Sequence, residues 1–164
     1  MSSSADAVFL VQLAAALRRA RLDAIIVGNA ASILNGAPVT TQDVDLLIRD
    51  TASNRQKLAR FADLVGGLPP VPLSELSNAE RILGAGVPIG VLFDSMAGGL
   101  KFASVRSRAE KATIDGERLV YATLADVIRS KRAANREKDR AVLPILQATL
   151  KTLKALDADK RKGK

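Results

Sequence analysis

The sequence predicts a mixed α/β fold, in which helices pack on a β-sheet of mixed strand direction. Short apolar segments rich in β-branched residues, typical of buried strands, are separated by longer amphipathic segments typical of helices. A strong hairpin signal follows the third strand, and two helical segments then complete the pattern. This order departs from the regular alternation of a doubly wound fold. The expected strands are 22–28, 43–50 and 86–94, and the expected hairpin is 112–122.

The first half of the chain is expected to begin with an amphipathic helix and to continue into a buried strand that ends at Gly28. Small residues after this strand favour a short helix, for which Gly36 is a natural C-terminal cap. A turn containing Pro38 leads to the second strand, and a pair of glycines ends the helix after it. The helices are expected at 5–20, 29–36 and 51–67, and a Pro-rich loop is expected at 68–78.

The second half of the chain contains the clearest turn signal. Asp115-Gly116 in the hairpin segment suits a type I′ turn, which needs positive φ at both central residues. Thr123 is the expected N-cap of the next helix. Pro144 is expected to kink the last helix because it cannot donate a backbone hydrogen bond. A short helix or turn is expected at 104–112, and longer helices at 123–135 and 136–157.

The composition excludes several kinds of chemistry. The 164 residues are 48% apolar, which suits a single domain over residues 1–157. The chain has no Cys and no His, which excludes thiolate chemistry, a histidine base and the commonest zinc ligand. Catalysis would rest on carboxylates, Lys, Arg, hydroxyls or a hard metal with oxygen ligands. The sequence shows no targeting signal and no apolar run of the roughly 18 residues that a membrane span needs, so we expect a cytoplasmic protein without a membrane partner.

The excess of positive charge lies near the C-terminal end. The net charge is +8, and segments 129–140 and 151–164 contribute +4 each. A basic C-terminal region suggests contact with a polyanion such as RNA. The alternative is a solvated helix face followed by a frayed end. For residues 158–164 we expect a disordered basic tail.

Segment 25–48 carries the features that point to chemistry. A buried strand ends at Gly28, where the chain turns into a helix, and the N–H groups at a helix start favour a phosphate. Asp43 and Asp45 lie at positions i and i+2 of the next strand, so their carboxylates would project from one face. Paired carboxylates repel unless a cation lies between them, and Mg²⁺ that also binds triphosphate oxygens would serve. Alternatively, Asp43 would cap the strand and Asp45 would pair with Arg49.

This segment resembles the signature of the DNA polymerase β-like nucleotidyltransferase superfamily, in which a strand leads to Gly-Gly or Gly-Ser, then a helix, then Asp-x-Asp on the next strand. The closer resemblance is to the bacterial branch of minimal nucleotidyltransferases that includes the AbiEii-type toxins. Segment 123–146 is also similar to the helical part of such proteins, and the resemblance spans residues 22–150. The matching residues are Gly28, Asn29, Ala30, Gly36, Thr41, Asp43, Asp45 and Leu46 in the first segment, and Lys131, Arg136, Lys138 and Asp139 in the second.

The resemblance implies a nucleotidyltransferase fold and a set of site residues. Mg²⁺ or Mn²⁺ would be the cofactor, and catalysis would depend on the two acids and Lys131. The alternative for the helical charges is salt bridging on the helix surface, for instance between Arg136 and Asp139. The implied nucleotide-binding residues are Gly28, Asn29, Thr41, Lys131 and Arg136, and the implied metal ligands are Asp43 and Asp45.

Three departures from the family pattern bear on activity. Asn29 replaces the second Gly or Ser, and its side chain would either hinder phosphate approach or supply an amide donor. Val39 replaces an Arg, which removes one cation. Gly90 stands where the superfamily carries a third carboxylate on a later strand. Asp94 has the same strand parity as Gly90 and would join the metal site only through a bulge or a shifted register.

Two functions follow from the resemblance. The first is transfer of a nucleoside monophosphate from a nucleoside triphosphate to an RNA end (tRNA, for example) or to a protein hydroxyl, in a toxin–antitoxin or phage-defence system. The second is a catalytically impaired module that binds a nucleotide, or a toxin or antitoxin partner, which Val39 and Gly90 favour. A nucleic-acid-binding protein without transferase activity is a third interpretation, although the scarcity of aromatic residues argues against base stacking.

Overall fold

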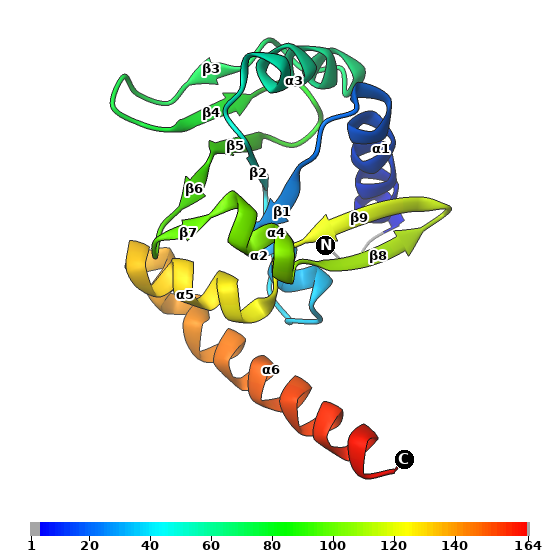
Figure 1. The fold of residues 1–164 in the computed structure, drawn as a ribbon, viewed down its shortest axis with the longest axis vertical. Helices are drawn as coiled ribbons and strands as arrows, with labels where there is room; N and C mark the ends of the chain where they lie inside the picture. Colours follow the sequence, from blue (N-terminus) through cyan, green and yellow to red (C-terminus); the bar gives the residue numbers. More distant parts are fainter. Residues whose placement is uncertain (1–3, 164) are drawn as a thin grey trace.

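The computed structural model describes residues 4–163, with side chains from Asp6 onward. Helices and strands combine in a mixed α/β arrangement, which confirms the predicted fold class (Figure 1). The helices are α1 (Ser4–Ala20), α2 (Gly28–Leu34), α3 (Ala52–Leu64), α4 (Phe102–Arg108), α5 (Leu124–Ala134) and α6 (Glu137–Lys162). The strands are β1 (Ile25–Val27), β2 (Val44–Ile48), β3 (Val71–Pro72), β4 (Ala79–Ile82), β5 (Ile89–Phe93), β6 (Ser95–Met96), β7 (Leu100–Lys101), β8 (Glu110–Ile114) and β9 (Glu117–Tyr121).

A seven-stranded sheet with the order β3-β4-β5-β2-β1-β9-β8 forms the centre of the molecule. β2 runs antiparallel to β1 and parallel to β5, and β1 runs parallel to β9. The other neighbouring pairs are antiparallel. β6 and β7 form a separate two-stranded ribbon. The two strands that carry the predicted site therefore lie side by side in the middle of the sheet.

Helices pack on both faces of this sheet. α3 lies on one face, because Arg55 forms an ion pair with Glu80 of β4 (3.0 Å) and lies over the ring of Phe93 of β5 (4.3 Å to the ring centre). α1 packs beside α3. α5 lies over the opposite face, where Val127 and Leu92 of β5 line one cavity. Successive side chains of a strand point to opposite faces, so each strand supplies residues to both layers.

The core consists mainly of aliphatic side chains. Every residue of β1 and β2 is buried except Asp45, which is partly exposed on the face of the sheet that α5 covers. A carboxylate in the middle of an apolar sheet costs free energy unless something compensates it. The largest side chains with almost no exposed surface include Leu13, Ile25, Ile26, Leu46, Leu47, Ile48, Leu58 and Phe61.

Local signals identified several elements correctly. Asp115 and Gly116 both have positive φ (50° and 80°) and join β8 to β9, which confirms the hairpin. The Thr123 side chain accepts a hydrogen bond from the backbone N–H of Asp126, which confirms this N-cap. Pro144 lies inside α6, which continues on both sides of it, and the kink expected there stays a prediction.

Other parts of the fold differ from the prediction. Residues 68–78 were expected to be a loop, but β3 forms there and pairs with β4, a strand that was not predicted. Pro, Ala and Glu in these strands are poor strand formers, so we attribute their pairing to the neighbouring β5 and not to propensity. Residues 158–162 were expected in a disordered tail but continue α6 as a helix. Lys164 lies outside the described residues. Among the described residues, no helix combines the length and apolar character that crossing a membrane requires.

Candidate active site

The turn from β1 into α2 depends on Gly28. Gly28 is the first residue of α2 and has φ +66°, a conformation that L side chains rarely adopt. A Cβ atom here would lie 3.0 Å from Oδ2 of Asp45 on the neighbouring strand. Val27 precedes the helix, and its side chain makes no capping hydrogen bond. The first N–H groups of α2 are thus available to an anion beside Asp45.

Gly90 makes room for Asp45 from the other side. The two residues are directly paired between β2 and β5. A Cβ atom on Gly90 would overlap Oδ1 of Asp45. Asp45 therefore has its carboxylate between two glycines, and position 90, where the third acid was expected, is filled by the Asp45 side chain itself.

Asp43 immediately precedes β2, and Thr41 holds it in place. The Thr41 hydroxyl lies 2.8 Å from the backbone carbonyl oxygen of Asp43 and 3.2 Å from its Oδ1. The backbone N–H of Asp43 also points to this hydroxyl, at 3.4 Å. Thr41 was predicted to bind nucleotide. It lines neither of the two cavities described below, and its hydroxyl contacts Asp43.

The electrostatics of Asp45 reflect its position in the sheet. Burial raises the pKa of the Asp45 carboxyl above its ordinary value, and the charge of Asp43 raises it further. The positive charges of Lys138, Lys131 and Arg136 act in the opposite direction but do not cancel the effect. Asp45 does not pair with Arg49, whose guanidinium lies over the Phe102 ring at 4.7 Å. The ionised form of Asp45 is therefore poorly compensated and would gain from a cation.

Lys131 and Arg136 share one buried carboxylate. Asp139 has no exposed surface, and Lys131 Nζ lies 3.3 Å from its Oδ1 while Arg136 Nε lies 2.7 Å from its Oδ2. The backbone N–H of Arg136 also donates to Asp139 Oδ2, at 3.2 Å. Burial alone would raise the pKa of Asp139, but the hydrogen bonds and charge of Arg136, with the charge of Lys131, hold it below its ordinary value. The alternative considered for Arg136, a salt bridge with Asp139, is therefore present, and the triad, which contains the two predicted nucleotide-binding cations, joins α5 to α6.

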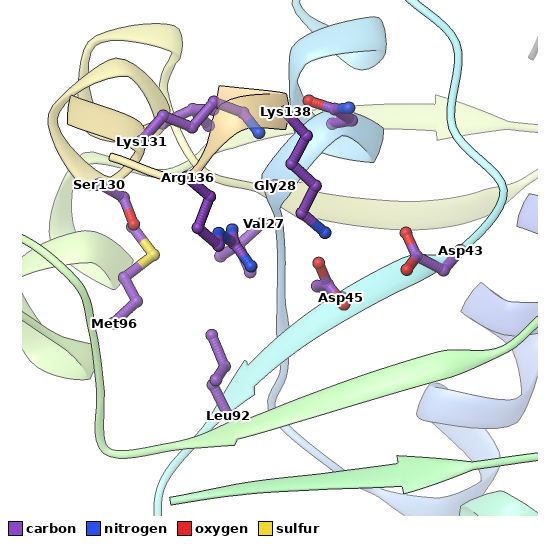
Figure 2. A pocket seen from close by; sticks show the side chains of 12 residues that line it. Val27, Gly28, Asp43, Asp45, Leu92, Met96, Ser130, Lys131, Arg136 and Lys138 are labelled. Atoms are coloured by element: carbon purple, nitrogen blue, oxygen red, sulfur yellow. The ribbon is translucent and has the colours of Figure 1, made fainter. Parts of the chain in front are cut away.

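Lys138 is the site residue that the sequence did not single out. It lies in the first turn of α6, and of the three cations it has the largest effect on the pKa of Asp45. Figure 2 shows its side chain pointing from α6 towards Asp45 and Asp43. The αL conformation of Asn135 (φ 51°) ends α5 and turns the chain so that Lys138 enters the site. Lys138 matches the helical pattern of the family, and this match was the one signal in the sequence that could have placed it in the site.

Two adjoining cavities meet at the acids. The first has a volume of about 110 Å³ and extends to Gly28, Asn29 and Lys131. The second has a volume of about 560 Å³ and extends over β4 and β5 to Arg81. The residues that line both are Asp43, Asp45, Leu92, Met96, Ser130, Arg136 and Lys138.

The side chain of Asn29, which lines the smaller cavity, has a polar atom without a partner. Its Oδ1 is buried and has no hydrogen-bond partner among the described residues. Asn29 follows Gly28 in the first turn of α2 and lines the smaller cavity. An unpaired buried polar atom costs free energy, and a ligand with a donor group would remove that cost.

Asp94 does not belong to the site. It follows the far end of β5, where its N–H donates to the carbonyl oxygen of Ile48 and its Oδ1 accepts a hydrogen bond of 2.8 Å from the Asp50 N–H. β2 and β5 pair without a bulge from Asp45–Gly90 onward. The register shift that would have made Asp94 a metal ligand is therefore absent, and the expectation for Asp94 was wrong.

The donor set fits a magnesium ion that also binds nucleotide phosphates. Mg²⁺ commonly uses one or two carboxylates, with phosphates and water completing its shell. Asp43 and Asp45 lie close enough for one charge to raise the pKa of the other, and a divalent cation would relieve this repulsion. The described residues hold no cluster of three or more acidic, His or Cys side chains suited to a metal. Asp43 and Asp45 would therefore share the ion with a ligand.

No protein-family model and no curated protein matches the sequence, but solved structures match its fold. The solution structure of the antibiotic-resistance factor ANT(2″)-Ia is 14% identical and aligns over 98% of this chain and 95% of its own, with a TM-score of 0.62. The crystal structure of ANT(2″)-Ia with adenylyl-2″-tobramycin is 16% identical over 97% and 98%, with a TM-score of 0.64. A candidate nucleotidyltransferase from Thermotoga maritima is 13% identical over 94% and 88%, with a TM-score of 0.53. The chain therefore has the nucleotidyltransferase fold.

Proposed function

We propose that the protein is a Mg²⁺-dependent nucleotidyltransferase that moves a nucleoside monophosphate from a nucleoside triphosphate to the end of an RNA. The observation that carries the proposal is the convergence of Asp43 and Asp45 with the Gly28 turn and a set of cations on α5 and α6. Acids for a metal and donors for phosphates thus surround one cavity. Such a set suits phosphoryl transfer, in which catalysis is mostly positioning and charge stabilisation.

We infer a part for each group from its place around the two cavities. The triphosphate would lie along the smaller cavity, with its phosphates at the start of α2 and beside Lys131. Arg136 and Lys138 line both cavities and would stabilise charge on the transferred and leaving groups. Mg²⁺ held by Asp43 and Asp45, when bound, would polarise the phosphoryl group. The larger cavity would receive the acceptor on the other side of the acids.

A basic groove, separate from the two cavities, supports RNA as the acceptor. It lies between α5 and α6 and has a volume of about 390 Å³. None of its four basic side chains forms an ion pair with a described residue, and no acid lines it. Cations that line one groove without an acidic partner can bind the phosphate backbone of a nucleic acid. The four are Arg129, Arg132, Lys151 and Lys154.

Nucleotide binding without transfer is a second candidate, and Gly90 favours it. The described acids that line the cavities are Asp43, Asp45 and Glu80, and Glu80 is paired with Arg55. The usual third carboxylate is thus missing. The resemblance to AbiEii-type toxins adds the proposal that the protein works in a toxin–antitoxin or phage-defence system with a toxin or antitoxin partner.

Label transfer tests the proposal directly. The protein is incubated with each α-labelled nucleoside triphosphate, Mg²⁺ and total RNA, beside an Asp43→Ala/Asp45→Ala variant. Label in RNA that disappears in the variant supports the transferase, and label in the protein indicates a protein hydroxyl as acceptor. Calorimetry with the same nucleotides measures binding separately. Binding without label transfer would support the second candidate.

A further inference from the structure

We propose that the acceptor attacks through an oxygen that is already ionised, a terminal phosphate of the RNA, and not through a hydroxyl. This inference rests on the proposed transferase function and specifies its substrate class. Two independent observations support it. One is that no described acid is placed to remove a proton from a hydroxyl, and the other is a cationic side chain on the acceptor side of Asp43 and Asp45.

No described acid is placed to act as a base for a hydroxyl. Asp43 and Asp45 would be occupied with the metal. Glu80 projects to the α3 side of the sheet and is paired with Arg55 at 3.0 Å. Asp139 is fully buried beneath Lys131 and Arg136. The chain has no His and no Cys, and Gly90 has no side chain.

The consequence for the acceptor follows from its acidity. A hydroxyl must lose its proton as it attacks, and a positioned base typically contributes about 100-fold to 10,000-fold to such a step. A phosphate monoester has a second pKa of about 6 and is largely ionised at neutral pH. A phosphate oxygen can therefore attack without a base. A site that has no base at position 90 favours a phosphate over a hydroxyl as the acceptor.

Arg81 supplies the matching cation. Asp45, Gly90 and Arg81 are paired in one row across β2, β5 and β4, so their side-chain positions face the same way. Neighbouring strands lie about 4.8 Å apart, which puts Arg81 about 10 Å from Asp45 with a glycine between them. Arg81 is exposed, lines the larger cavity and has no ion-pair partner among the described residues. A guanidinium here can bind a phosphate and hold it over Gly90 beside the acids.

The reaction balances without a further reagent. An oxygen of the terminal phosphate forms a bond to the α-phosphorus of the nucleoside triphosphate. The bond from the α-phosphorus to the bridging oxygen breaks, and pyrophosphate leaves with that electron pair. The product is a phosphoanhydride between the nucleoside monophosphate and the RNA end, and no proton has to be removed from the acceptor.

The test uses the full-length protein and one RNA oligonucleotide in three forms, which carry a 5′-phosphate, a 3′-phosphate or hydroxyls at both ends. Each is incubated with Mg²⁺ and the α-labelled nucleotide that binds by calorimetry. We expect label on a phosphate-ended RNA at a rate at least about 10-fold above the hydroxyl-ended RNA, in an alkaline-phosphatase-resistant form that a diphosphate-cleaving hydrolase releases.

Two variants sharpen the result. Arg81→Gln should raise the KM for the phosphate-ended RNA about tenfold while nucleotide binding stays unchanged, because a charge-assisted contact to the acceptor is lost. Arg60→Gln, an exposed cation on α3, is the matched control and should behave as wild type. Circular dichroism checks that each variant is folded.

Equal or faster labelling of the hydroxyl-ended RNA by the wild-type protein would overturn the inference. Nucleotide binding without label on any of the three RNAs would also overturn it, and would support the binding module. Failure to bind any nucleotide with Mg²⁺ would instead overturn the proposed function itself. The wild-type comparison decides the matter even where a variant fails to fold.

Discussion

The Asp45 carboxylate fills the space that any side chain on Gly90 would need, although the two residues belong to different strands and are 45 positions apart. Gly90 stands where the resemblance led us to expect a third acid, and the Asp45 carboxylate lies where the side chain of that acid would begin. Substitutions at either position should therefore act through the other.

Replacing Gly90 with Ala should weaken nucleotide binding. The added methyl group overlaps Oδ1 of Asp45, so this carboxylate must leave its place beside Asp43. We expect the affinity for a Mg²⁺–nucleoside triphosphate to fall on the order of tenfold, measured by calorimetry. Gly163→Ala is the control, because its added Cβ would lie 3.7 Å from the nearest atom, the Asp159 carbonyl oxygen, in ordinary contact. Unchanged affinity in Gly90→Ala would show that nucleotide binding does not need Asp45 where it lies.

Asp45→Asn should stabilise the free protein while removing Mg²⁺-dependent nucleotide binding. The amide has nearly the shape of the carboxylate but no buried charge to desolvate. We expect the free energy of unfolding without metal to rise by about 1 kcal/mol, the usual size of such a trade between stability and function. Urea denaturation in a chelating buffer measures it. A less stable variant would mean that the Asp45 charge is already well compensated by Lys138 and its neighbours.

The cost of the buried Asp45 charge should also appear in the pH dependence of stability. The pKa of Asp45 in the folded protein lies above its value of about 4 in the unfolded chain. Between these two pKa values the folded protein therefore binds more protons than the unfolded chain. This contribution is therefore largest at low pH, declines as pH rises through the folded pKa, and is constant above it. Other acids titrate too, so the measured quantity is the difference between wild type and Asp45→Asn in metal-free denaturation at each pH. A difference that does not change from pH 4 upward would contradict the raised pKa.

Asp139→Asn should destabilise the protein strongly. The substitution leaves Lys131, which is 8% exposed, without its buried counter-charge. Breaking a buried pair from one side costs about 3 kcal/mol or more, so we expect a loss of that order in urea denaturation. Glu117→Gln removes the partner of Arg18 in an exposed pair and should change stability far less. A similar effect of the two substitutions would mean that the triad is not a structural link.

Neutralising the basic groove between α5 and α6 should weaken RNA binding without affecting nucleotide binding. Each lost phosphate contact should lower the slope of log affinity against log salt concentration by about 0.7 for single-stranded RNA. Fluorescence anisotropy at several salt concentrations measures this slope. An unchanged slope would exclude the groove as an RNA contact. The test variant replaces Arg129, Arg132, Lys151 and Lys154 with Ala, and the control replaces Arg19, Lys57, Arg60 and Lys111.

The central part of the site could be predicted because it is local in sequence. Gly28 directly follows β1 and Asp45 lies on the adjoining antiparallel strand β2, so a short stretch of chain brings the two residues together. Hairpin and cap signals such as Asp115-Gly116 are local in the same way.

The parts that the sequence did not reveal depend on contacts between distant segments. Lys138 enters the site through the angle between α5 and α6, which Asn135 sets. Arg81 lies on β4, whose pairing with β5 has no propensity signal. Asp94 has the right parity along β5, but its carboxylate binds the Asp50 backbone across the sheet. Strand parity alone therefore gives the face on which a side chain lies, and not its neighbours.

The buried triad of Lys131, Arg136 and Asp139 has a consequence for the speed of ligand capture. Lys131 and Arg136 both donate hydrogen bonds to the buried Asp139, so these two cations at the cavity are held in place by the fold itself before a ligand binds. A nucleotide that arrives has few side chains to immobilise, and so loses little of its binding energy to ordering them. Association should then be limited mainly by diffusion and electrostatic steering, and α5 and α6 should superpose closely between the free and the nucleotide-bound protein.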